Sequence, residues 1–220
     1  MTLERLVLMR HGQTDWNVAF RMQGHSNIAL NAVGRSQAVA AAPSVAALAP
    51  GVIVSSDLDR AHDTALEVAA LLGQKVLIDK RLRETHMGQW EGLTRDDVVT
   101  GWPGEWAQWR TTSAHKSPPD GESRWQVAQR ANQVVTELDA GNTDSALLVV
   151  HGGLIVGLTG LLLDLPDAVW GHLIGVNNCH WVVLHRLDGA DITSGWRLHS
   201  YNAGLASVVI PGGEDEVPGA

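Results

Sequence analysis

Two histidines in this sequence stand beside glycine at the ends of short apolar runs, and arginine accompanies them. His11 follows Arg10 after the run LVLM, and His151 follows the run ALLVV. Arg60 comes shortly after a third apolar run, GVIV. A guanidinium group matches the oxygens of a phosphate in two-pronged geometry. These four side chains predict a pocket for a compact anion such as a phosphoryl group.

An imidazole among guanidinium groups is suited to nucleophilic attack. Neighbouring positive charge disfavours its protonation, so we expect His11 to stay neutral below the usual titration point. Neutral imidazole can attack phosphorus, and the resulting phosphohistidine divides the transfer into two steps, the second of which can use water. Arginine can stabilise the charge of the transferred group. The residues therefore predict phosphoryl transfer without a metal or another cofactor.

Glu84 is the expected proton donor for such a reaction. It closes the stretch KVLIDKRLRE, which the apolar pattern predicts as a strand. A phosphate bound nearby disfavours the carboxylate, so the group can donate a proton to a leaving alkoxide and later accept one from water. The alternative for Glu84 is an ion pair with Arg81 or Arg83.

Strand and helix patterns alternate along the chain. Apolar runs predict strands at residues 5–10, 51–57, 75–84 and 146–153, and a final hairpin at 178–186 and 195–202. Helices are predicted at 32–42 after the cap Asn31, at 59–73 with Gly73 as the stop, and at 123–138 and 154–165. Pro43 either ends or kinks the first helix. Strands separated by helices predict a three-layer α/β/α sandwich with a mainly parallel sheet.

The predicted sheet would bring the candidate residues together. Ligands of open α/β sheets bind beyond the carboxyl ends of the strands, which is where His11, His151 and Glu84 are expected, with Asp57 and Arg60 just after another strand. The neighbouring glycines are predicted to let backbone amides approach the ligand; they are Gly12, Gly152 and Gly153. A lone histidine at a strand end is more often structural, so the catalytic interpretation depends on the combination.

The organisation of the chain points to one domain. Residues 1–220 carry no fixed repeat, a capping box in TRDD precedes a tryptophan-rich stretch, and a helical insertion is expected at about 90–138. The tail, 211–220, is expected to be flexible. Trp102, Trp106 and Trp109 are spaced by four and three, as on one helical face. We favour a packed stripe for them over a lid that contacts a sugar, and consider Trp90 the better candidate for lining the pocket.

Composition excludes several classes of protein. The formal net charge of −8 argues against a broad nucleic-acid or anionic-membrane surface. Residues 146–163 are long enough for a marginal membrane span, but the central His-Gly-Gly and the flanking aspartates favour strand, turn and helix. The single cysteine, Cys179, excludes an intrachain disulfide, and fits a reducing cytoplasm. The other histidines lack zinc-ligand spacing, so no metal site is predicted.

The motifs LMRHGQTDWN, VSSDLDRAHDTA, RLRETHMGQWEG and VVHGGLI occur in the order typical of the histidine phosphatase superfamily, also called phosphoglycerate mutase-like. The resemblance extends from residue 5 to about 165. It implies that fold, with His11 as the phosphorylated nucleophile and Glu84 as the proton donor. It further implies phosphate or substrate contacts from the side chains that match its polar positions, namely Arg10, Asn17, Gln23, Arg60 and His151. Asn17 could instead cap a helix, and Gln23 could be a solvated loop residue.

Within the superfamily, the sequence resembles the actinobacterial, especially mycobacterial, glucosyl-3-phosphoglycerate phosphatases. This resemblance implies a cytoplasmic homodimer that hydrolyses a small phosphoester to glucosylglycerate and phosphate, early in the biosynthesis of methylglucose lipopolysaccharides. Three alternatives stay open: a phosphatase of another small phosphoester, a phosphoglycerate mutase, and a phosphate-binding module without turnover. The mutases carry a longer insertion between the positions of Glu84 and His151, and binding modules usually lose the nucleophile or an arginine, which this sequence keeps.

Overall fold

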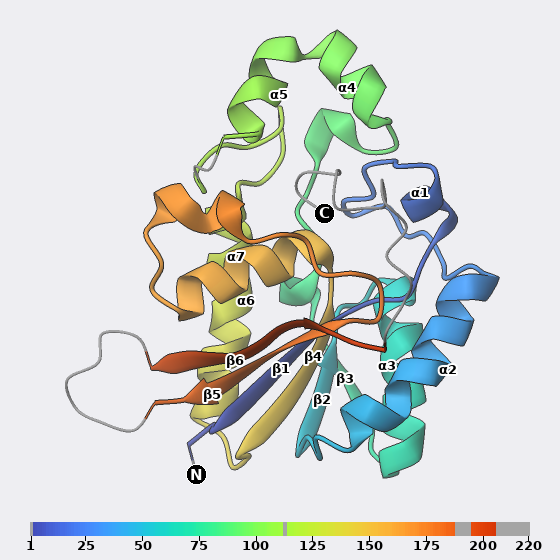
Figure 1. Ribbon diagram of the computed structural model, residues 1–220, viewed down its shortest axis with the longest axis vertical. Helices are drawn as coiled ribbons and strands as arrows, with labels where there is room; N and C mark the ends of the chain where they lie inside the picture. The colour runs from blue at the N-terminus through green and yellow to red at the C-terminus, as the bar shows by residue number, and fades with distance from the viewer. Residues whose placement is uncertain (1, 112–113, 188–194, 206–220) are drawn as a thin grey trace.

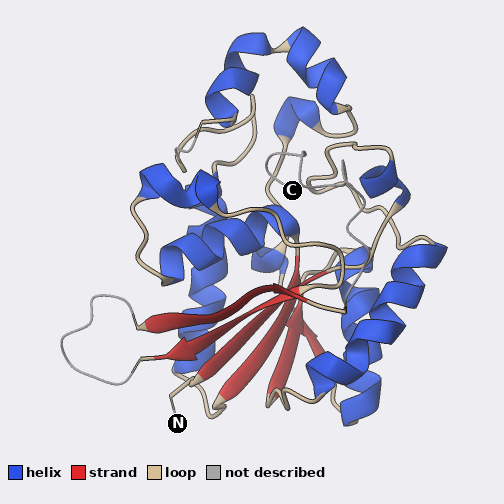
Figure 2. Cartoon of the chain, in the orientation of Figure 1, coloured by secondary structure: helices blue, strands red, loops and turns tan. Residues whose placement is uncertain are grey.

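The computed structural model describes residues 2–111, 114–187 and 195–205. These residues form one sheet with helices on both faces and a further pair of helices at one end (Figures 1 and 2). The strands are β1 (Arg5–Arg10), β2 (Val52–Ser55), β3 (Val76–Ile78), β4 (Ser145–Val150), β5 (Trp181–Arg186) and β6 (Trp196–Ala203). The helices are α1 (Asp15–Val18), α2 (Ala32–Ala46), α3 (Asp59–Leu72), α4 (Arg95–Gly101), α5 (Pro103–Trp109), α6 (Arg124–Asp139) and α7 (Gly152–Leu162), with 3₁₀ turns η1 (Lys80–Leu82), η2 (Gly88–Trp90) and η3 (Asp167–His172).

The sheet has the strand order β3-β2-β4-β1-β5-β6. Strands β1 to β4 are mutually parallel where they pair, and Arg10 at the end of β1 lies opposite Val150 at the end of β4. Strand β5 is antiparallel to β1 and to β6, so the predicted final hairpin is confirmed. The mainly parallel sheet and the three-layer sandwich are confirmed as well. The carboxyl ends of β1, β2 and β4 therefore meet at one edge.

Two apolar cores follow from the alternation of side chains along the strands. On one face, Leu6, Leu8 and Leu148 pack against α6 and α7, where Val127 and Leu154 are fully buried. On the other face, the intervening residues of β1 and β4 pack against alanine-rich surfaces of α2 and α3. Successive side chains of a strand point to opposite faces, so a strand that is covered on both sides reads as a continuous apolar run. Because helices pack on both faces, the sheet holds the carboxyl ends of β1 and β4 in fixed positions.

Local signals account for most of the helix ends. The side chain of Asn31 accepts a hydrogen bond from Gly34 N and caps α2, as predicted. Pro43 does not end this helix, which continues to Ala46. Gly73 ends α3 in the left-handed conformation, with φ of 63°. The capping box at Thr94 is also confirmed, at the start of α4.

The predicted strand at 75–84 is wrong for its second half. Only Val76–Ile78 pairs with β2. The Asp79 side chain accepts a hydrogen bond from Arg81 N at 2.8 Å and starts the turn η1, which competes with further strand pairing. Glu84 therefore does not close a strand. It is carried by an irregular segment that follows η1.

The tryptophans form a third apolar cluster at the end of the molecule that holds α4 and α5. Trp106 and Trp109 lie on α5 and are buried, while Trp102 lies at the junction of the two helices and is partly buried. Trp90 is fully buried, with its ring centroid 5.9 Å from Trp106 and 6.1 Å from Trp109. The tryptophans are packed, as favoured, but they do not share one helical face, because the chain leaves α4 at Trp102 before α5 begins. Trp90 is a core residue of this cluster rather than the wall of an open pocket. Met22 and Met87 complete it.

Residues 146–163 divide into β4 and helix α7, with His151 at the junction. In the described part of the chain, no helix is long and apolar enough to cross a membrane. Cys179 is a buried thiol in the core beside α2 and α3. Helix α6, which falls in the range expected for the insertion, packs on α7 and contributes to the main core. The predicted flexible tail, 211–220, lies outside the described residues.

Candidate active site

The two histidines lie together at the edge where β1 and β4 end. The ring centroids of His11 and His151 are 5.2 Å apart, and the rings are tilted by 59°. Their exposed fractions are 2% and 0%, so protein surrounds both. The register of the parallel pair β1 and β4 sets this distance, because His11 and His151 are the residues that directly follow its last aligned positions.

His11 is held in one tautomer. Its Nδ1 atom lies 2.7 Å from the carbonyl oxygen of Gly12. A carbonyl oxygen can only accept, so Nδ1 carries the proton and Nε2 keeps its lone pair. Burial, and then the charges of Arg60 and Arg10, hold the pKa of His11 well below its usual value. The ring is thus a neutral base with a free nucleophilic nitrogen.

His151 has no hydrogen-bond partner at either ring nitrogen, although it is fully buried. Burial is the first cause that lowers its pKa well below the usual value, and the positive charges of Arg60, Arg130 and Arg10 lower it further. Leaving a buried polar group unpaired costs about 1–3 kcal/mol. A structural histidine would satisfy at least one nitrogen, so this ring is expected to meet a ligand.

Arg60 reaches the site from the first turn of α3, where its side chain is fully buried. Its Nη1 and Nη2 atoms donate to the carbonyl oxygens of Ser26 and Gly24, at 2.8 and 2.9 Å, and Nε has no partner. Burial lowers the pKa of Arg60 to about 10, so the group remains charged at neutral pH. Arg60 therefore supplies fixed positive charge and an available N–H donor.

Arg10 is also buried, at 4% exposure, and its Nη1 donates to Val176 O at 2.7 Å. The carbonyl of Val176 precedes β5, so this bond ties the loop before β5 to the end of β1. The charges of both arginines are among the causes that lower the pKa of His11 and of His151. The structure therefore brings all four residues of the predicted anion pocket together.

Glu84 lies at the N-terminus of α7, directly beside His151. Its Oε2 accepts from Gly153 N at 3.0 Å, and its Oε1 accepts from Leu154 N at 3.1 Å and from Thr85 N at 2.7 Å. A helix N-terminus favours a negative charge. Glu84 is thus held at the site by hydrogen bonds from its side chain to the first turn of α7, and not by its position at the end of a strand. The ion pair with Arg81 or Arg83 is not formed, because these arginines bind Asp79 and Asp57 respectively.

Asn17 and Gln23 are linked through Thr14 at the same edge. The Oδ1 atom of Asn17 accepts from Thr14 N at 2.9 Å, so Asn17 belongs to the capping box of α1. The Oε1 atom of Gln23 accepts from Thr14 Oγ1 at 3.0 Å. Both amides use their oxygens inside the protein, which leaves their NH₂ groups as donors. The helix-capping alternative for Asn17 is therefore correct, and it is compatible with binding an anion.

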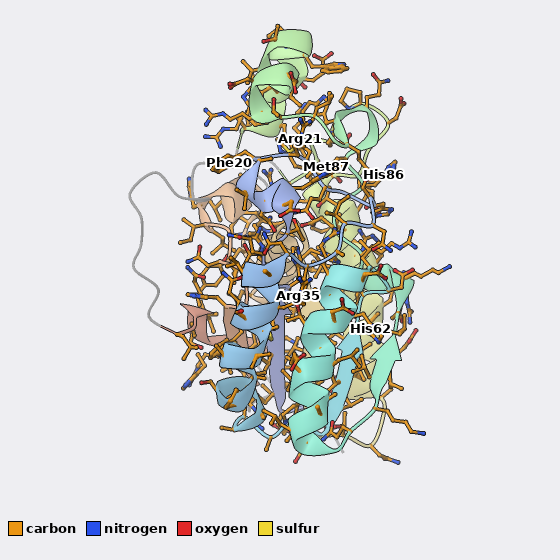
Figure 3. All side chains as sticks on the ribbon, turned by 90° about the vertical axis from the view of Figure 1, so that its right-hand side faces the viewer. Phe20, Arg21, Arg35, His62, His86 and Met87 are labelled. Atoms are coloured by element: carbon orange, nitrogen blue, oxygen red, sulfur yellow. The ribbon has the colours of Figure 1, made fainter. Side chains whose placement is uncertain are left out.

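Figure 3 shows the segment after α1, with Phe20 and Arg21, at the height of His86 and Met87 above α2 and α3.

In the ligand-free structure the amides of Gly12 and Gly153 are already paired within the protein. Gly12 N donates to Thr64 Oγ1 at 3.0 Å, and Gly153 N donates to Glu84, so neither amide is available to a ligand in this structure. A Cβ atom on Gly12 would lie 2.4 Å from the carbonyl oxygen of Gly34. Close contact between the segment after β1 and the start of α2 is what requires glycine there.

Asn178 is a site residue that the sequence interpretation missed. Its Nδ2 donates to His11 O at 3.0 Å and lies 3.5 Å from Oδ1 of Asn17. Cys179, next to it, adopts φ of 58° and donates its N–H to the carbonyls of Arg10 and His11. This turn therefore fixes the backbone of the two central residues. The only signal in the sequence is its position just before β5, the strand that pairs with β1.

Among residues 2–111, 114–187 and 195–205, no group of three or more His, Cys, Asp or Glu side chains could hold a metal ion. The positive charge at the site comes instead from Arg10 and Arg60. Two buried imidazoles between two buried guanidinium groups, beyond the carboxyl ends of parallel strands, define an α/β protein built to hold a compact anion against a neutral histidine.

Residues 6–204 match the model of the histidine phosphatase superfamily (branch 1), so the chain belongs to this superfamily. It is 46% identical, over 215 residues, to the glucosyl-3-phosphoglycerate phosphatase of Mycobacterium tuberculosis, covering 92% of this chain and 96% of that protein. A solved structure of the mycobacterial glucosyl-3-phosphoglycerate phosphatase in complex with VO₃ is similar, with a TM-score of 0.84, 45% identity, and coverage of 91% and 100% of the two chains.

A relative with a different name is similar over nearly the same length. The Yersinia enterocolitica protein named probable phosphoglycerate mutase GpmB is 34% identical over 203 residues, or 89% of this chain and 91% of that protein. Chain length therefore does not separate this sequence from every protein named as a mutase. The expectation that mutases carry a longer insertion does not hold for this relative.

Proposed function

We propose that this protein is a metal-independent phosphatase that hydrolyses glucosyl-3-phosphoglycerate to glucosylglycerate and phosphate. The observation that carries the proposal is the neutral His11 ring, with Nε2 free and two buried arginines beside it. The choice of substrate is supported by the 46% identity to the mycobacterial enzyme of that name.

In the first step, Nε2 of His11 attacks phosphorus, and the bond from phosphorus to the substrate oxygen breaks. Arg10, Arg60 and His151 surround the transferred group and stabilise the charge on its oxygens. The leaving alkoxide takes a proton from Glu84. The products of this step are phosphohistidine, the alcohol and the Glu84 carboxylate.

In the second step, water attacks phosphorus and gives a proton to Glu84, and the bond between nitrogen and phosphorus breaks. This restores His11 and releases phosphate. General acid or base catalysis of this kind contributes about 10²–10⁴ in rate. In the ligand-free structure the Glu84 oxygens accept three backbone N–H groups, which hold the carboxyl group at the N-terminus of α7. A phosphate monoester titrates near pH 6, so its monoanion can supply the proton that Glu84 passes to the leaving group.

Asn17 and Gln23 are proposed to donate their amide hydrogens to the phosphate or to the adjoining part of the substrate. Their oxygens are held by Thr14, which orients the NH₂ groups in advance. Donors that need no reorganisation when charge develops are the ones that accelerate phosphoryl transfer.

The assembly and location are proposed from the same relatives. We propose a cytoplasmic homodimer whose product enters the early steps of methylglucose lipopolysaccharide biosynthesis. Its partner is then a small-molecule phosphoester, with no role for nucleic acid or a membrane. The net charge of −8 supports this restriction to small anions, which the buried arginines can meet locally.

A phosphoglycerate mutase is the second candidate, and the 34% identity to the Yersinia enterocolitica protein favours keeping it. A third candidate is a phosphatase of a different small phosphoester. Such an enzyme would use the same phosphate pocket and would differ only in the residues that contact the rest of the substrate. A binding module without turnover is disfavoured, since the free Nε2 of His11 serves no purpose in mere binding.

The test is phosphate release from four esters in the presence of EDTA, with the wild type and His11→Ala. The esters are glucosyl-3-phosphoglycerate, 3-phosphoglycerate, a sugar phosphate and p-nitrophenyl phosphate. We expect release strongly biased to the glucosylated ester, and a loss of at least about 10³-fold in His11→Ala. Slow and equal release from every ester would remove the substrate assignment, and no release from any would favour the binding module. Isomerisation of 3-phosphoglycerate in place of release would favour the mutase.

A further inference from the structure

A single arginine on α6, Arg130, forms hydrogen bonds with the backbone of the segment that carries Glu84. The guanidinium of Arg130 donates from Nη1 to the carbonyl oxygens of Arg81 and Arg83, at 2.6 and 2.7 Å, and from Nη2 to the carbonyl oxygen of Glu84 at 2.7 Å. Three carbonyls of four consecutive residues thus end on one side chain. Three such hydrogen bonds from one side chain require the planar guanidinium group with its several N–H donors.

The guanidinium is itself fixed from the other side. Glu122 accepts from Nε and Nη2 of Arg130 with its two oxygens, both at 2.9 Å. Glu122 also accepts from His86 N at 2.9 Å, two residues beyond Glu84. The pair therefore holds the chain both before and after Glu84. A carboxylate that binds a guanidinium with two parallel bonds sets its plane as well as its position.

The segment needs this support because no sheet provides it. Strand β3 ends at Ile78, and η1 ends at Leu82. Besides Arg130, the backbone of Glu84 has one further side-chain donor, Nε2 of His25 at 2.8 Å from its carbonyl oxygen. The carboxylate of Glu84 meanwhile meets the amides of α7. Its reach across to α7 depends on where the Arg130 bonds place its backbone.

We propose that Arg130 is a positioning residue that sets the Glu84 carboxyl for proton transfer to the leaving group. This inference rests on the proposed function. It assigns a catalytic consequence to a residue on α6 that touches neither the phosphate nor the reacting atoms. It also implies that the pair of Arg130 and Glu122 connects α6 to the chemistry at the end of α7.

Arg130 has a second effect that the test must separate from positioning. Its charge is among those that lower the pKa of His151, so it contributes to the field around the phosphate. Loss of that charge slows every phosphate ester alike, because all of them present the same transferred group. Loss of positioning slows only esters whose leaving group needs a proton. Arg130→Lys keeps the charge and loses the fork, whereas Arg130→Met loses both.

The experiment measures kcat/KM, which covers the steps up to the release of the alcohol, for two esters. Glucosyl-3-phosphoglycerate has an alkoxide leaving group that requires a proton, and p-nitrophenyl phosphate has a stable phenolate that does not. Glu84→Gln serves as the reference for a lost acid. Arg186→Met is the matched control, because Arg186 is equally buried, with 19% of its side chain exposed against 18%, and forms an ion pair with Asp139. It lies on β5 at the opposite edge of the sheet from His11.

We expect Arg130→Lys to lose about 10²-fold on the glucosylated ester and less than about threefold on p-nitrophenyl phosphate, in proportion to the general-acid contribution. Arg130→Met should add a loss common to both esters. Glu84→Gln should show the same selectivity more strongly, and Arg186→Met should lose nothing on either. If Arg130→Met does not fold, Arg130→Lys alone decides the question.

Equal losses on both esters in Arg130→Lys, or no loss, would overturn the positioning role while leaving the proposed function intact. Failure of the proposed function has a different signature. The wild type would then release phosphate from neither ester, or Glu84→Gln would show no dependence on the leaving group, and the positioning role would fall with it.

Discussion

The Nδ1 atom of His11 lies 2.7 Å from the carbonyl oxygen of Gly12, its own neighbour in the chain. This contact determines which nitrogen can attack. Because the carbonyl oxygen accepts a hydrogen bond from Nδ1–H, Nε2 carries the lone pair, and no other side chain is needed to set the tautomer. The backbone after β1 therefore performs the orientation that an acidic residue performs in many other histidine sites.

We predict that His11 remains the neutral Nδ1–H tautomer at pH 6, where a free imidazole is mostly protonated. Burial is the main cause of the lowered pKa, and the charges of Arg60 and Arg10 add to it. Nitrogen chemical shifts of histidine-labelled protein, assigned with His11→Gln, measure both the tautomer and the titration. A titration midpoint at or above pH 6 would contradict the prediction.

The lowered pKa values of the two buried histidines make the free energy of unfolding depend on pH. Below pH 6.5 the unfolded chain binds protons that the folded protein excludes from His11 and His151. The free energy of unfolding therefore decreases as the pH falls from about 6.5 toward the lowered folded values. The carboxylates with lowered pKa, among them Asp57 and Glu122, act only at lower pH, near their own ordinary values. Urea denaturation should show a smaller decrease in His11→Gln than in the wild type.

His151→Ala is expected to lower kcat by about 10²–10³-fold, which is typical of removing one donor to a developing charge. Both of its ring nitrogens are buried without partners, so no hydrogen bond of the ligand-free protein is lost with the ring. We therefore expect the free energy of unfolding to change little beyond the effect of the cavity. His151→Asn, which retains a donor, should recover part of the rate. Kinetics of phosphate release and urea denaturation of both variants decide the matter, and unchanged kcat in the alanine variant would remove His151 from the mechanism.

How far sequence predicts this site differs from residue to residue. Arg10, His11 and His151 were predictable, because each belongs to a strand end and the sheet edge follows from strand order. Glu84 was identified by its type and motif, but not by its position. The side chain of Asp79 caps the turn η1 and so ends β3 early. A pattern of apolar residues gives little indication that a side chain will compete with strand pairing in this way.

The residues that support the site were the least predictable. Arg130 lies on helix α6, and the three carbonyl groups that it binds are 46 to 49 residues away along the chain. Asn178 binds the carbonyl of His11 across 167 positions. Contacts of this kind have no spacing signal, since they arise only when the sheet edge is assembled.

Gly34→Ala is expected to destabilise the protein by about 3 kcal/mol, at the upper end of ordinary overpacking. A Cβ atom there would lie 2.0 Å from the carbonyl oxygen of Gln13, which is backbone and cannot rotate away. The displacement would also move the Gly12 carbonyl that orients His11, so kcat should fall with stability. Gly104→Ala is the control. It meets nothing within 4 Å in α5, and it should be neutral or slightly stabilising by urea denaturation.

Trp109→Ala tests whether the tryptophans are a packed cluster or a lid that contacts the substrate. The side chain is 1% exposed, its edge meets Trp90, and the guanidinium of Arg124 lies 4.4 Å from its ring centroid. Removing a buried tryptophan costs about 3–5 kcal/mol, and we expect that loss in urea denaturation. Phe20→Ala, at 42% exposure, should change stability by less than about 0.5 kcal/mol. A large rise in KM for the glucosylated ester with unchanged stability would instead assign Trp109 to substrate binding, because a ring that stabilises only the complex contributes nothing to the free protein.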